Sequence, residues 1–208
     1  LVSTIPIKTT YTILQPKTPP EIMSAIQNIQ LSSLLILYVV VNTPRVLPVN
    51  WIFFPEARFH FARLSEQKGF SEEMVPKDKT IITVEIPFAR EYIQKMDHEK
   101  LIAESLQQLR EVGILKPEHE VLETFTGYDE SIYPIYNLTY QENLDQILSF
   151  SDTIPHFYLN GRLGLFCYNN MDHSMEMGLT LADHIASNGS IDEWRSKRDF
   201  FYEYKIVD

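Results

Sequence analysis

The fold of this chain is decided by fourteen residues near its C-terminal end, Gly161-Arg162-Leu163-Gly164-Leu165-Phe166-Cys167-Tyr168-Asn169-Asn170-Met171-Asp172-His173-Ser174. A short apolar run, Phe157-Tyr158-Leu159, precedes them and has the composition of a strand. The apolar residues that follow recur with helical spacing, at Met171, Met175, Gly178, Leu179, Ala182, Ile185 and Ala186. The segment therefore predicts a strand, a glycine turn and the N-terminus of a helix, in that order.

Such a turn has two interpretations. Glycine at 161 and 164 lets the backbone pass close to a bulky ligand, and the free amides that start the helix after Asp172 favour an electron-rich or anionic group. The same residues also suit a capped surface helix after a strand, with Asn170 or Asp172 as the N-cap and no ligand. Spacing alone leaves both open.

Three pieces of the chain resemble one known family. The stretch from Gly161 to Asp172 is similar to the closing flavin-contact motif of the flavin-dependent amine oxidase and protoporphyrinogen oxidase superfamily, which includes the UDP-galactopyranose mutase branch. That motif runs strand, Gly-Arg-x-Gly, aromatic residue, Asn-x-Asp, helix. Matching pieces lie at Tyr133-Pro134-Ile135-Tyr136 and at Val2-Ser3-Thr4-Ile5-Pro6, so the resemblance is spread over the whole chain.

The resemblance implies a cofactor and the residues that contact it. The cofactor is FAD, and residues 161–164 would face its ribityl or pyrophosphate portion. Backbone amides at residues 171–173 would approach the pyrimidine end of the isoalloxazine. The implied cofactor contacts are Gly161, Arg162, Gly164, Tyr168, Asn170, Met171, Asp172 and His173.

One family feature is missing from the sequence. Such enzymes begin with a strand, a Gly-x-Gly-x-x-Gly loop and a helix that cradle the dinucleotide pyrophosphate, whereas no glycine precedes Gly69 here. We therefore expect the C-terminal part of a longer flavoprotein, whose N-terminal nucleotide-binding half is its partner. Residues 1–10 would return from the FAD domain, 11–150 would form the substrate-binding domain, and 151–208 would be the strand-turn-helix of the FAD domain and a tail.

Composition fits a folded domain. The 208 residues are 44% hydrophobic and 12% aromatic, which suffices for a sizeable core. The net charge of −10 argues against nucleic acid or an anionic membrane surface as the main partner. The apolar run from Leu34 to Val41 is too short to span a bilayer and predicts a buried strand.

A single cysteine, Cys167, excludes an internal disulfide and any multi-cysteine metal site. A reducing, cytoplasmic location is the simpler interpretation. Cys167 lies inside the predicted flavin loop, where covalent flavin attachment is conceivable, but its apolar neighbours favour an inert packed thiol. Asp172-His173 and Asp183-His184 have the wrong spacing for metal ligands on one helix, so we predict no metal.

The remaining pattern predicts an α+β fold, with a mixed or antiparallel sheet backed by helices. Helices are expected from Pro20, over residues 96–112 with Met96 in the apolar stripe and Gly113 as terminator, and from about Tyr140. Strands are expected at residues 51–54, 58–63, 80–86 and 120–126. Residues 133–136 would lead from the last strand toward the helix at Tyr140.

Substrate contacts follow from the resemblance rather than from a motif. Arg58, His60 and Arg63 are expected on a strand of the substrate domain, with Arg63 pointing opposite to the other two. A guanidinium there would suit an anionic small-molecule substrate, and Tyr133, Tyr136 or Tyr168 would wall the flavin or substrate. Exposed basic residues on an edge strand, and ordinary core packing of the tyrosines, are the alternatives.

Two classes of function follow. The first is an FAD-dependent oxidoreductase that moves a hydride between a small organic substrate and flavin, with a flavin-dependent UDP-sugar mutase as its close alternative. The second is a non-catalytic binding or assembly module. In that case the isolated chain would bind FAD poorly and an unpaired strand at residues 157–159 would promote self-association. The sequence specifies neither the substrate nor the reaction type.

Overall fold

A computed structural model describes residues 1–14, 18–88 and 97–206. The chain forms two compact units, which we call the terminal unit, Leu1–Leu31 with Ser131–Asp208, and the sheet unit, Ser32–Glu130. The chain leaves the terminal unit within strand β2 (Gln30–Val41) and returns to it within strand β6 (Val121–Ile135). The sheet unit is therefore a continuous segment inserted into the terminal unit.

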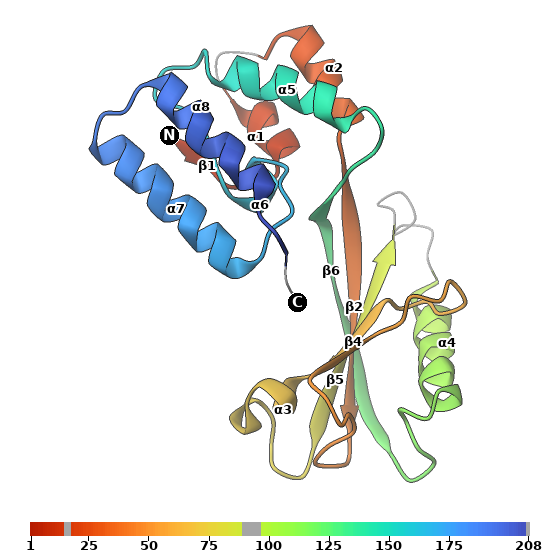
Figure 1. The fold of residues 1–208 in the computed structure, drawn as a ribbon. Helices are drawn as coiled ribbons and strands as arrows, with labels where there is room; N and C mark the ends of the chain where they lie inside the picture. The colour runs from red at the N-terminus through yellow and green to blue at the C-terminus, as the bar shows by residue number, and fades with distance from the viewer. Residues whose placement is uncertain (15–17, 89–96, 207–208) are drawn as a thin grey trace. The chain divides into compact units, whose positions relative to one another are not determined.

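The sheet unit is built on a five-stranded sheet of the described residues, in the order β3-β4-β5-β2-β6 (Figure 1). The strands besides β2 and β6 are β3 (Trp51–Phe53), β4 (Arg63–Glu66) and β5 (Thr80–Phe88). The pairs β3–β4, β4–β5 and β2–β5 are antiparallel. Along β2 every second side chain from Leu35 to Val41 is buried, the alternation expected when one sheet face is covered.

Helix α4 (His98–Glu111) covers that face, and Leu109 packs into the core formed by the strands (Figure 1). Asp97 caps its start, with its carboxylate accepting from the Lys100 N–H at 3.0 Å. Gly113, at φ +77°, follows its end. The predicted helix and its terminator are confirmed over the described residues, while Met96 lies outside them. The unit also contains α3 (Gln67–Phe70) and the 3-10 turn η1 (Glu72–Met74).

The terminal unit packs helices around a short parallel pair of strands, β1 (Val2–Ser3) and β7 (Tyr158–Leu159). Its core contains Ile26, Ile147, Phe166, Met177 and Trp194, all at most 1% exposed. The helices are α1 (Ile7–Ile13), α2 (Pro20–Asn28), α5 (Tyr140–Ser151), α6 (Gly161–Gly164), α7 (Met171–Ala186) and α8 (Ile191–Phe200), followed by the 3-10 turn η3 (Phe201–Glu203). The α+β fold class is confirmed, since an antiparallel sheet and helices make up the chain.

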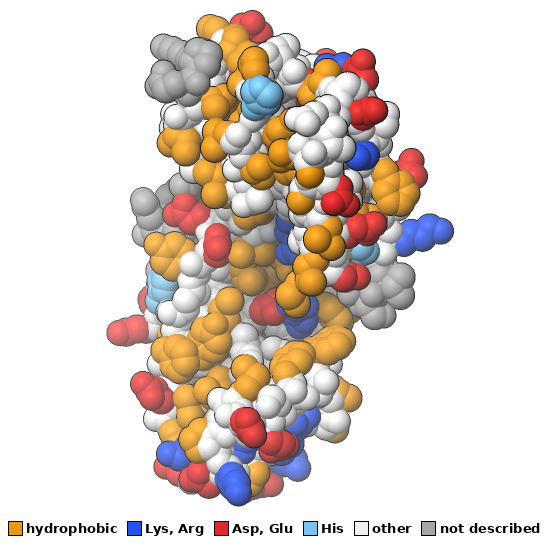
Figure 2. All heavy atoms as spheres, turned by 90° about the vertical axis from the view of Figure 1, so that its left-hand side faces the viewer, with side chains coloured by type: hydrophobic (Ala, Val, Ile, Leu, Met, Phe, Trp, Pro, Cys, Tyr) orange, Lys and Arg blue, Asp and Glu red, His pale blue; other side chains and the backbone are white. Residues whose placement is uncertain are grey.

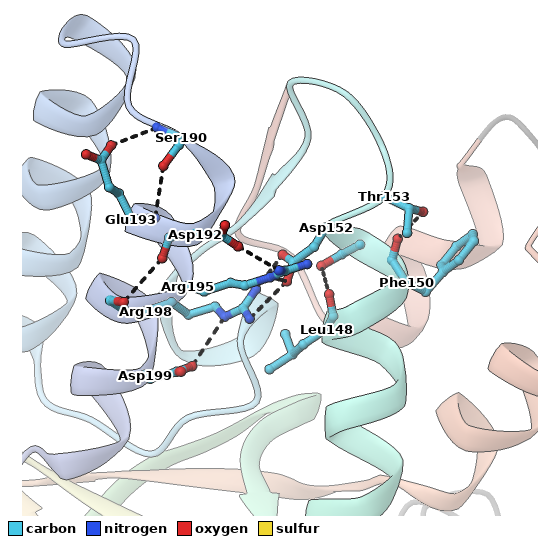
Figure 3. Close-up of polar contacts among 12 residues, drawn as sticks. Leu148, Phe150, Asp152, Thr153, Ser190, Asp192, Glu193, Arg195, Arg198 and Asp199 are labelled. Atoms are coloured by element: carbon cyan, nitrogen blue, oxygen red, sulfur yellow. Dashed lines mark hydrogen bonds and ion pairs between the residues drawn. The ribbon is translucent and has the colours of Figure 1, made fainter.

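A buried ion-pair network ties α5 to α8 (Figure 3). The Asp152 carboxylate, 4% exposed, accepts from both Nη atoms of Arg198 at 2.7 and 3.2 Å and from Nε of Arg195 at 2.8 Å. Arg198 is itself 7% exposed, so its charge depends on Asp152 for compensation. Asp192 adds an exposed contact to Arg195.

The strand predicted at residues 58–63 is wrong, because β4 begins only at Arg63. Residues 58–62 form a turn instead, in which the Phe59 N–H donates to the Glu56 carbonyl. Phe59 and Phe61 alternate with polar residues as they would in a strand, but their rings stack on each other and meet Phe54 edge to face. A local aromatic cluster therefore produced the misleading two-residue period.

Two other expectations change at the strands. The strand predicted at 120–126 continues through Gly127 to Ile135 as β6, so residues 133–135 belong to it. The strand at residues 157–159 is not orphaned, because β7 pairs with β1 in the register Val2 to Tyr158 and Ser3 to Leu159. One edge of this strand is therefore paired, and self-association of the chain stays a prediction. Among the described residues, no helix combines the length and the apolar character needed to cross a bilayer.

We expect Asp152→Asn to lower the free energy of unfolding by about 3 kcal/mol or more, since it leaves the Arg198 guanidinium buried without a counter-charge. Urea unfolding followed by far-UV circular dichroism measures this. Asp192→Asn is the matched control, because it removes an exposed contact to the same Arg195 and should change stability by less than about 0.5 kcal/mol. Equal effects of the two variants would contradict the role of the buried pair.

Candidate functional site

The predicted cofactor residues lie together in the terminal unit, where β7 is followed by the single helical turn α6, by residues 165–170 and by α7. We call α6 and residues 165–170 together the loop at residues 161–170. The predicted strand, glycine turn and helix are therefore all present. The loop is held from within: the Leu165 N–H donates to the Gly161 carbonyl at 3.0 Å and the Cys167 N–H to the Arg162 carbonyl at 2.9 Å. Both contacts are made by the backbone of the loop itself.

Arg162 lies at the centre of the loop. Its guanidinium donates to the Asn169 carbonyl through Nη2 and lies 3.4 Å from Asn169 Oδ1 through Nε. It also lies over the rings of Tyr133, at 4.9 Å from the centroid, and Tyr168, at 5.5 Å. Arg162 thus fastens the two ends of the loop together and joins them to β6, and it is half-buried rather than free in solvent.

Asn169 is a residue of this site that the sequence analysis did not select. It is fully buried, and its Oδ1 accepts from the Ser174 hydroxyl at 3.1 Å while its Nδ2 lies 2.9 Å from the Met177 sulfur. It thereby connects the loop to the first turns of α7. It lies directly before the Asn-x-Asp motif, which is formed by residues 170–172, and no sequence pattern indicated a role for it.

Helix α7 begins at Met171, with Asn170 as the N-cap, one of the two residues expected there. Asn170 and His173 form a capping box in which the Asn170 N–H donates to Nδ1 of His173 at 3.2 Å. The His173 ring stacks on Tyr204 at 4.4 Å between centroids. The N–H groups of Met171 and Asp172 have no intrahelical acceptor, and both residues are exposed. This helix end can therefore donate to an electron-rich group.

Tyr136 and Tyr168 provide exposed aromatic surface beside the loop. The Tyr168 N–H donates to the Tyr136 hydroxyl at 2.7 Å, which fixes the two residues relative to each other. Burial, partly offset by this backbone hydrogen bond, raises the pKa of Tyr136, so its phenol is neutral near neutral pH. Both rings remain more than a third exposed and can cover a planar ligand.

The backbone and packing of the protein itself explain why residues 161 and 164 are glycine. Gly161 has φ +74°, which few other residues adopt. A Cβ on Gly164 would lie 2.6 Å from the Ser3 carbonyl oxygen, so this glycine is needed for α6 to pack on β1. The close approach attributed to a ligand in the sequence analysis is, for Gly164, an approach to the N-terminal strand.

Cys167 is unsuited to covalent attachment of a cofactor. It is 2% exposed, and its thiol lies 3.4 Å from the Phe201 carbonyl. Burial raises the pKa of the thiol to about 11, and the nearby Arg162 charge offsets this only in part. The interpretation of an inert packed thiol agrees with this environment.

Three of the predicted substrate residues, Arg58, His60 and Arg63, lie in the sheet unit, where the structure separates them, whereas Tyr136 belongs to the terminal unit. Arg63 points away from α4, because its neighbour Leu64 faces the core. Its Nε and Nη2 donate to Glu85 at 2.9 and 2.6 Å, and its guanidinium lies 5.8 Å from the Phe53 centroid. The charge of Arg63 is thus already paired.

Arg58 and His60 belong instead to the turn that is bound to α4. Gln108 of α4 donates to the Arg58 carbonyl at 2.9 Å and accepts from the His60 N–H at 3.0 Å. The His60 ring lies 3.3 Å from the Glu104 carboxylate. The expectation that Arg63 faces away from the other two rested on a strand at residues 58–63, and the structure has no strand before Arg63 there.

In the described part of the chain, no three His, Cys, Asp or Glu side chains are grouped as metal ligands would be.

Comparison with solved structures identifies the fold. Reduced UDP-galactopyranose mutase matches with a TM-score of 0.80 and 21% identity over 91% of this chain. A protein from Exiguobacterium sp. 255-15 assigned as a protoporphyrinogen oxidase matches with a TM-score of 0.63 and 13% identity over 88%. Putrescine oxidase redesigned for cofactor binding matches with a TM-score of 0.62 and 16% identity over 89%. No protein-family profile matches the sequence.

These matches confirm the fold that the sequence resemblance implied. The chain spans 41%, 40% and 42% of the lengths of the three proteins, respectively. Each of the three proteins is therefore more than twice as long as the part of it that this chain matches, and its activity is that of the longer polypeptide.

Gly164→Ala should destabilise the 208-residue chain by about 2 kcal/mol, because the new methyl group overlaps the Ser3 carbonyl oxygen. Gly178→Ala in α7 is the control, because no atom lies within 4 Å of its Cβ position. This change should raise the free energy of unfolding by up to about 1 kcal/mol, since alanine favours a helix more than glycine does. Urea unfolding measures both. A neutral Gly164→Ala would contradict the need for glycine where α6 packs on β1.

Proposed function

We propose that this chain is the C-terminal part of an FAD-dependent oxidoreductase that transfers a hydride between a small organic substrate and flavin. Two observations support this. The fold is shared over about nine tenths of the chain with a mutase and with two proteins named as oxidases. The loop at residues 161–170 presents an amide-bearing helix end beside exposed tyrosines.

The helix end carries the proposal, because it offers what an isoalloxazine ring requires at its electron-rich edge. The Met171 and Asp172 N–H groups would donate to that edge, and Tyr136 and Tyr168 would cover the ring. Arg162 would add positive charge behind the tyrosines. Bound flavin would supply the hydride acceptor, while these residues orient it. By the resemblance, the nucleotide end of FAD would be held by a Gly-x-Gly-x-x-Gly loop in an N-terminal half of the protein.

The substrate would contact the sheet unit through the face opposite α4. Phe53 and Trp51 are exposed on β3 next to Arg63, and Trp51 stacks on Phe70. Such a face suits an organic substrate with an apolar or planar part. Arg63 fits a role in substrate contact better than Arg58 and His60 do, because the turn that carries those two residues is held against α4. Because Glu85 neutralises Arg63, a substrate without a full negative charge fits this face better than an anion.

A UDP-sugar mutase is the second candidate. The observation in its favour is the TM-score of 0.80 to UDP-galactopyranose mutase, against 0.63 and 0.62 for the two other proteins. In that reaction reduced flavin would act as a nucleophile with no net oxidation. The fold and the loop at residues 161–170 are common to both candidates, so only an activity measurement separates them.

The complete product of the gene that encodes this chain should purify with bound flavin, whereas the 208-residue chain should bind added FAD poorly. Anaerobic bleaching of the flavin by an amine or a porphyrinogen would establish the oxidoreductase. Product formation from a UDP-sugar only after prereduction would establish the mutase instead. A colourless complete protein that binds no added FAD would contradict both candidates.

A cytoplasmic location stays a prediction.

Met171→Pro tests the helix-end amides directly. Proline is favoured at the first position of a helix, and Asn170 already has the extended backbone that precedes proline, so the change removes one N–H and spares the helix. In the complete protein we expect FAD to bind about five- to tenfold more weakly, the value of one hydrogen bond.

Met171→Ala keeps the N–H and serves as the control in the same titration of apoprotein with FAD. If the proline and alanine variants bind FAD equally well, the amide contact does not exist.

A further inference from the structure

After α8 the chain turns back onto the loop at residues 161–170. The 3-10 turn η3 and Tyr204 follow α8 directly, and we call residues 201–204 the α8 tail. In Figure 1 the end of α8 lies beside α6, the helical turn that opens the loop. The α8 tail therefore adjoins the proposed cofactor site, although it lies outside the sequence motif on which that site was predicted.

Tyr202 holds the first half of the loop. Its hydroxyl donates to the Leu165 carbonyl at 2.6 Å. Leu165 is the residue at which α6 ends, and its own N–H donates to the Gly161 carbonyl. Burial raises the pKa of Tyr202 well above its ordinary value, so the phenol keeps the proton that it donates. The bond from Tyr202 thus fixes the end of α6.

Tyr204 holds the start of α7. Its ring stacks on the His173 ring, with 4.4 Å between the centroids and 13° between the planes. His173 accepts the N–H of Asn170, the N-cap of α7, through Nδ1. The stack therefore orients the imidazole that completes the capping box, directly before the two open amides of the helix.

Phe201 anchors the α8 tail between these two contacts. It is 1% exposed in the core of the terminal unit, and its carbonyl lies 3.4 Å from the Cys167 thiol. Its ring also stacks on the Tyr204 ring, at 5.8 Å between centroids. From this fixed point the tail reaches the loop through Tyr202 and the helix start through Tyr204.

Burial of apolar area does not account for the tyrosine at position 202. Figure 2 views the side on which α7 lies in Figure 1, and hydrophobic side chains reach the surface there. Helix α7 itself is apolar on two faces, one buried through Met177 and Leu181 and one exposed through Met175 and Leu179. Tyr202 is likewise 37% exposed. Phenylalanine would provide the same ring, so the specific contribution of tyrosine is its hydroxyl bond to the loop.

We propose that Tyr202 and Tyr204 are positioning residues, which hold the loop at residues 161–170 and the first turn of α7 in the arrangement that accepts flavin. This inference rests on the proposed function. Neither side chain touches the flavin: Tyr202 acts through the Leu165 carbonyl, and Tyr204 acts through His173. A ligand binds only the fraction of molecules in the competent arrangement, so a loosened loop raises the apparent dissociation constant.

Hydrogen exchange in the 208-residue chain tests the hold on the loop without a cofactor. Tyr202→Phe removes the hydroxyl and keeps the ring. We expect the amides of Leu165 and Cys167 to exchange about five- to tenfold faster, the value of one hydrogen bond in the opening equilibrium. The amides of Ile147 and Leu148 in α5 report opening of the whole unit and should change by less.

Titration of the complete apoprotein with FAD tests the consequence for the cofactor. Tyr202→Phe and Tyr204→Leu should each weaken FAD binding about five- to tenfold. Tyr204→Leu should also change the visible spectrum of the bound flavin, because the helix end beside the ring is no longer held. Tyr204→Phe returns the ring to His173 and should restore both the affinity and the spectrum.

The outcomes separate this inference from the proposed function. A native complete protein that binds no FAD overturns the proposed function, and this inference with it. Native FAD binding that keeps its affinity and spectrum in Tyr202→Phe and Tyr204→Leu overturns the positioning role alone. Equal losses in Tyr204→Leu and Tyr204→Phe overturn the role of the stacked ring. Equal acceleration of exchange in the loop and in α5 overturns the proposal, since the α8 tail would then stabilise only the unit as a whole.

Discussion

The pairing of β1 with β7 is the constraint on which the terminal unit depends. It brings Val2 and Ser3 against residues more than 150 positions later, and the Ser3 carbonyl then leaves room only for glycine at position 164. The position of α6 is thereby fixed, and with it the start of the loop that carries Arg162. The geometry of the proposed cofactor site is thus set by the N-terminal residues as much as by the motif itself.

The loop at residues 161–170 is held by contacts within the protein. Arg162 and Asn169 fasten its ends, Asn169 also contacts Ser174 and Met177 of α7, and the Tyr168 N–H is held by Tyr136. This organisation explains why so few polar groups of the loop remain for a ligand: most are already used by the protein, and the helix end at Met171 and Asp172 is the part that stays open.

The helices and strands could be predicted from the sequence where apolar residues recur with the spacing of a helix or a strand. The buried alternation of β2, the capped helix α4 and the strand-turn-helix at residues 158–186 were all visible in the sequence, because their signals lie within a few residues of one another. Long-range contacts were not visible. The bond between Asp152 and Arg198 joins residues 46 positions apart, and the contact of Arg162 with Tyr133 depends on the course of β6. The turn at residues 58–62 was misread because an aromatic cluster imitates a strand. For α7, periodicity identified a helix but could not show which of its two apolar faces is buried.

The way the chain enters and leaves the sheet unit bears on how such proteins diversify. Ser33 at the entrance donates to the carbonyl of Glu130 at the exit, 3.1 Å away, so the two crossing points are neighbours. A segment whose ends meet can be lengthened, shortened or exchanged by recombination without breaking the body into which it is inserted. Under this arrangement, the inserted sheet can be changed while the scaffold built around β1 and β7 stays constant.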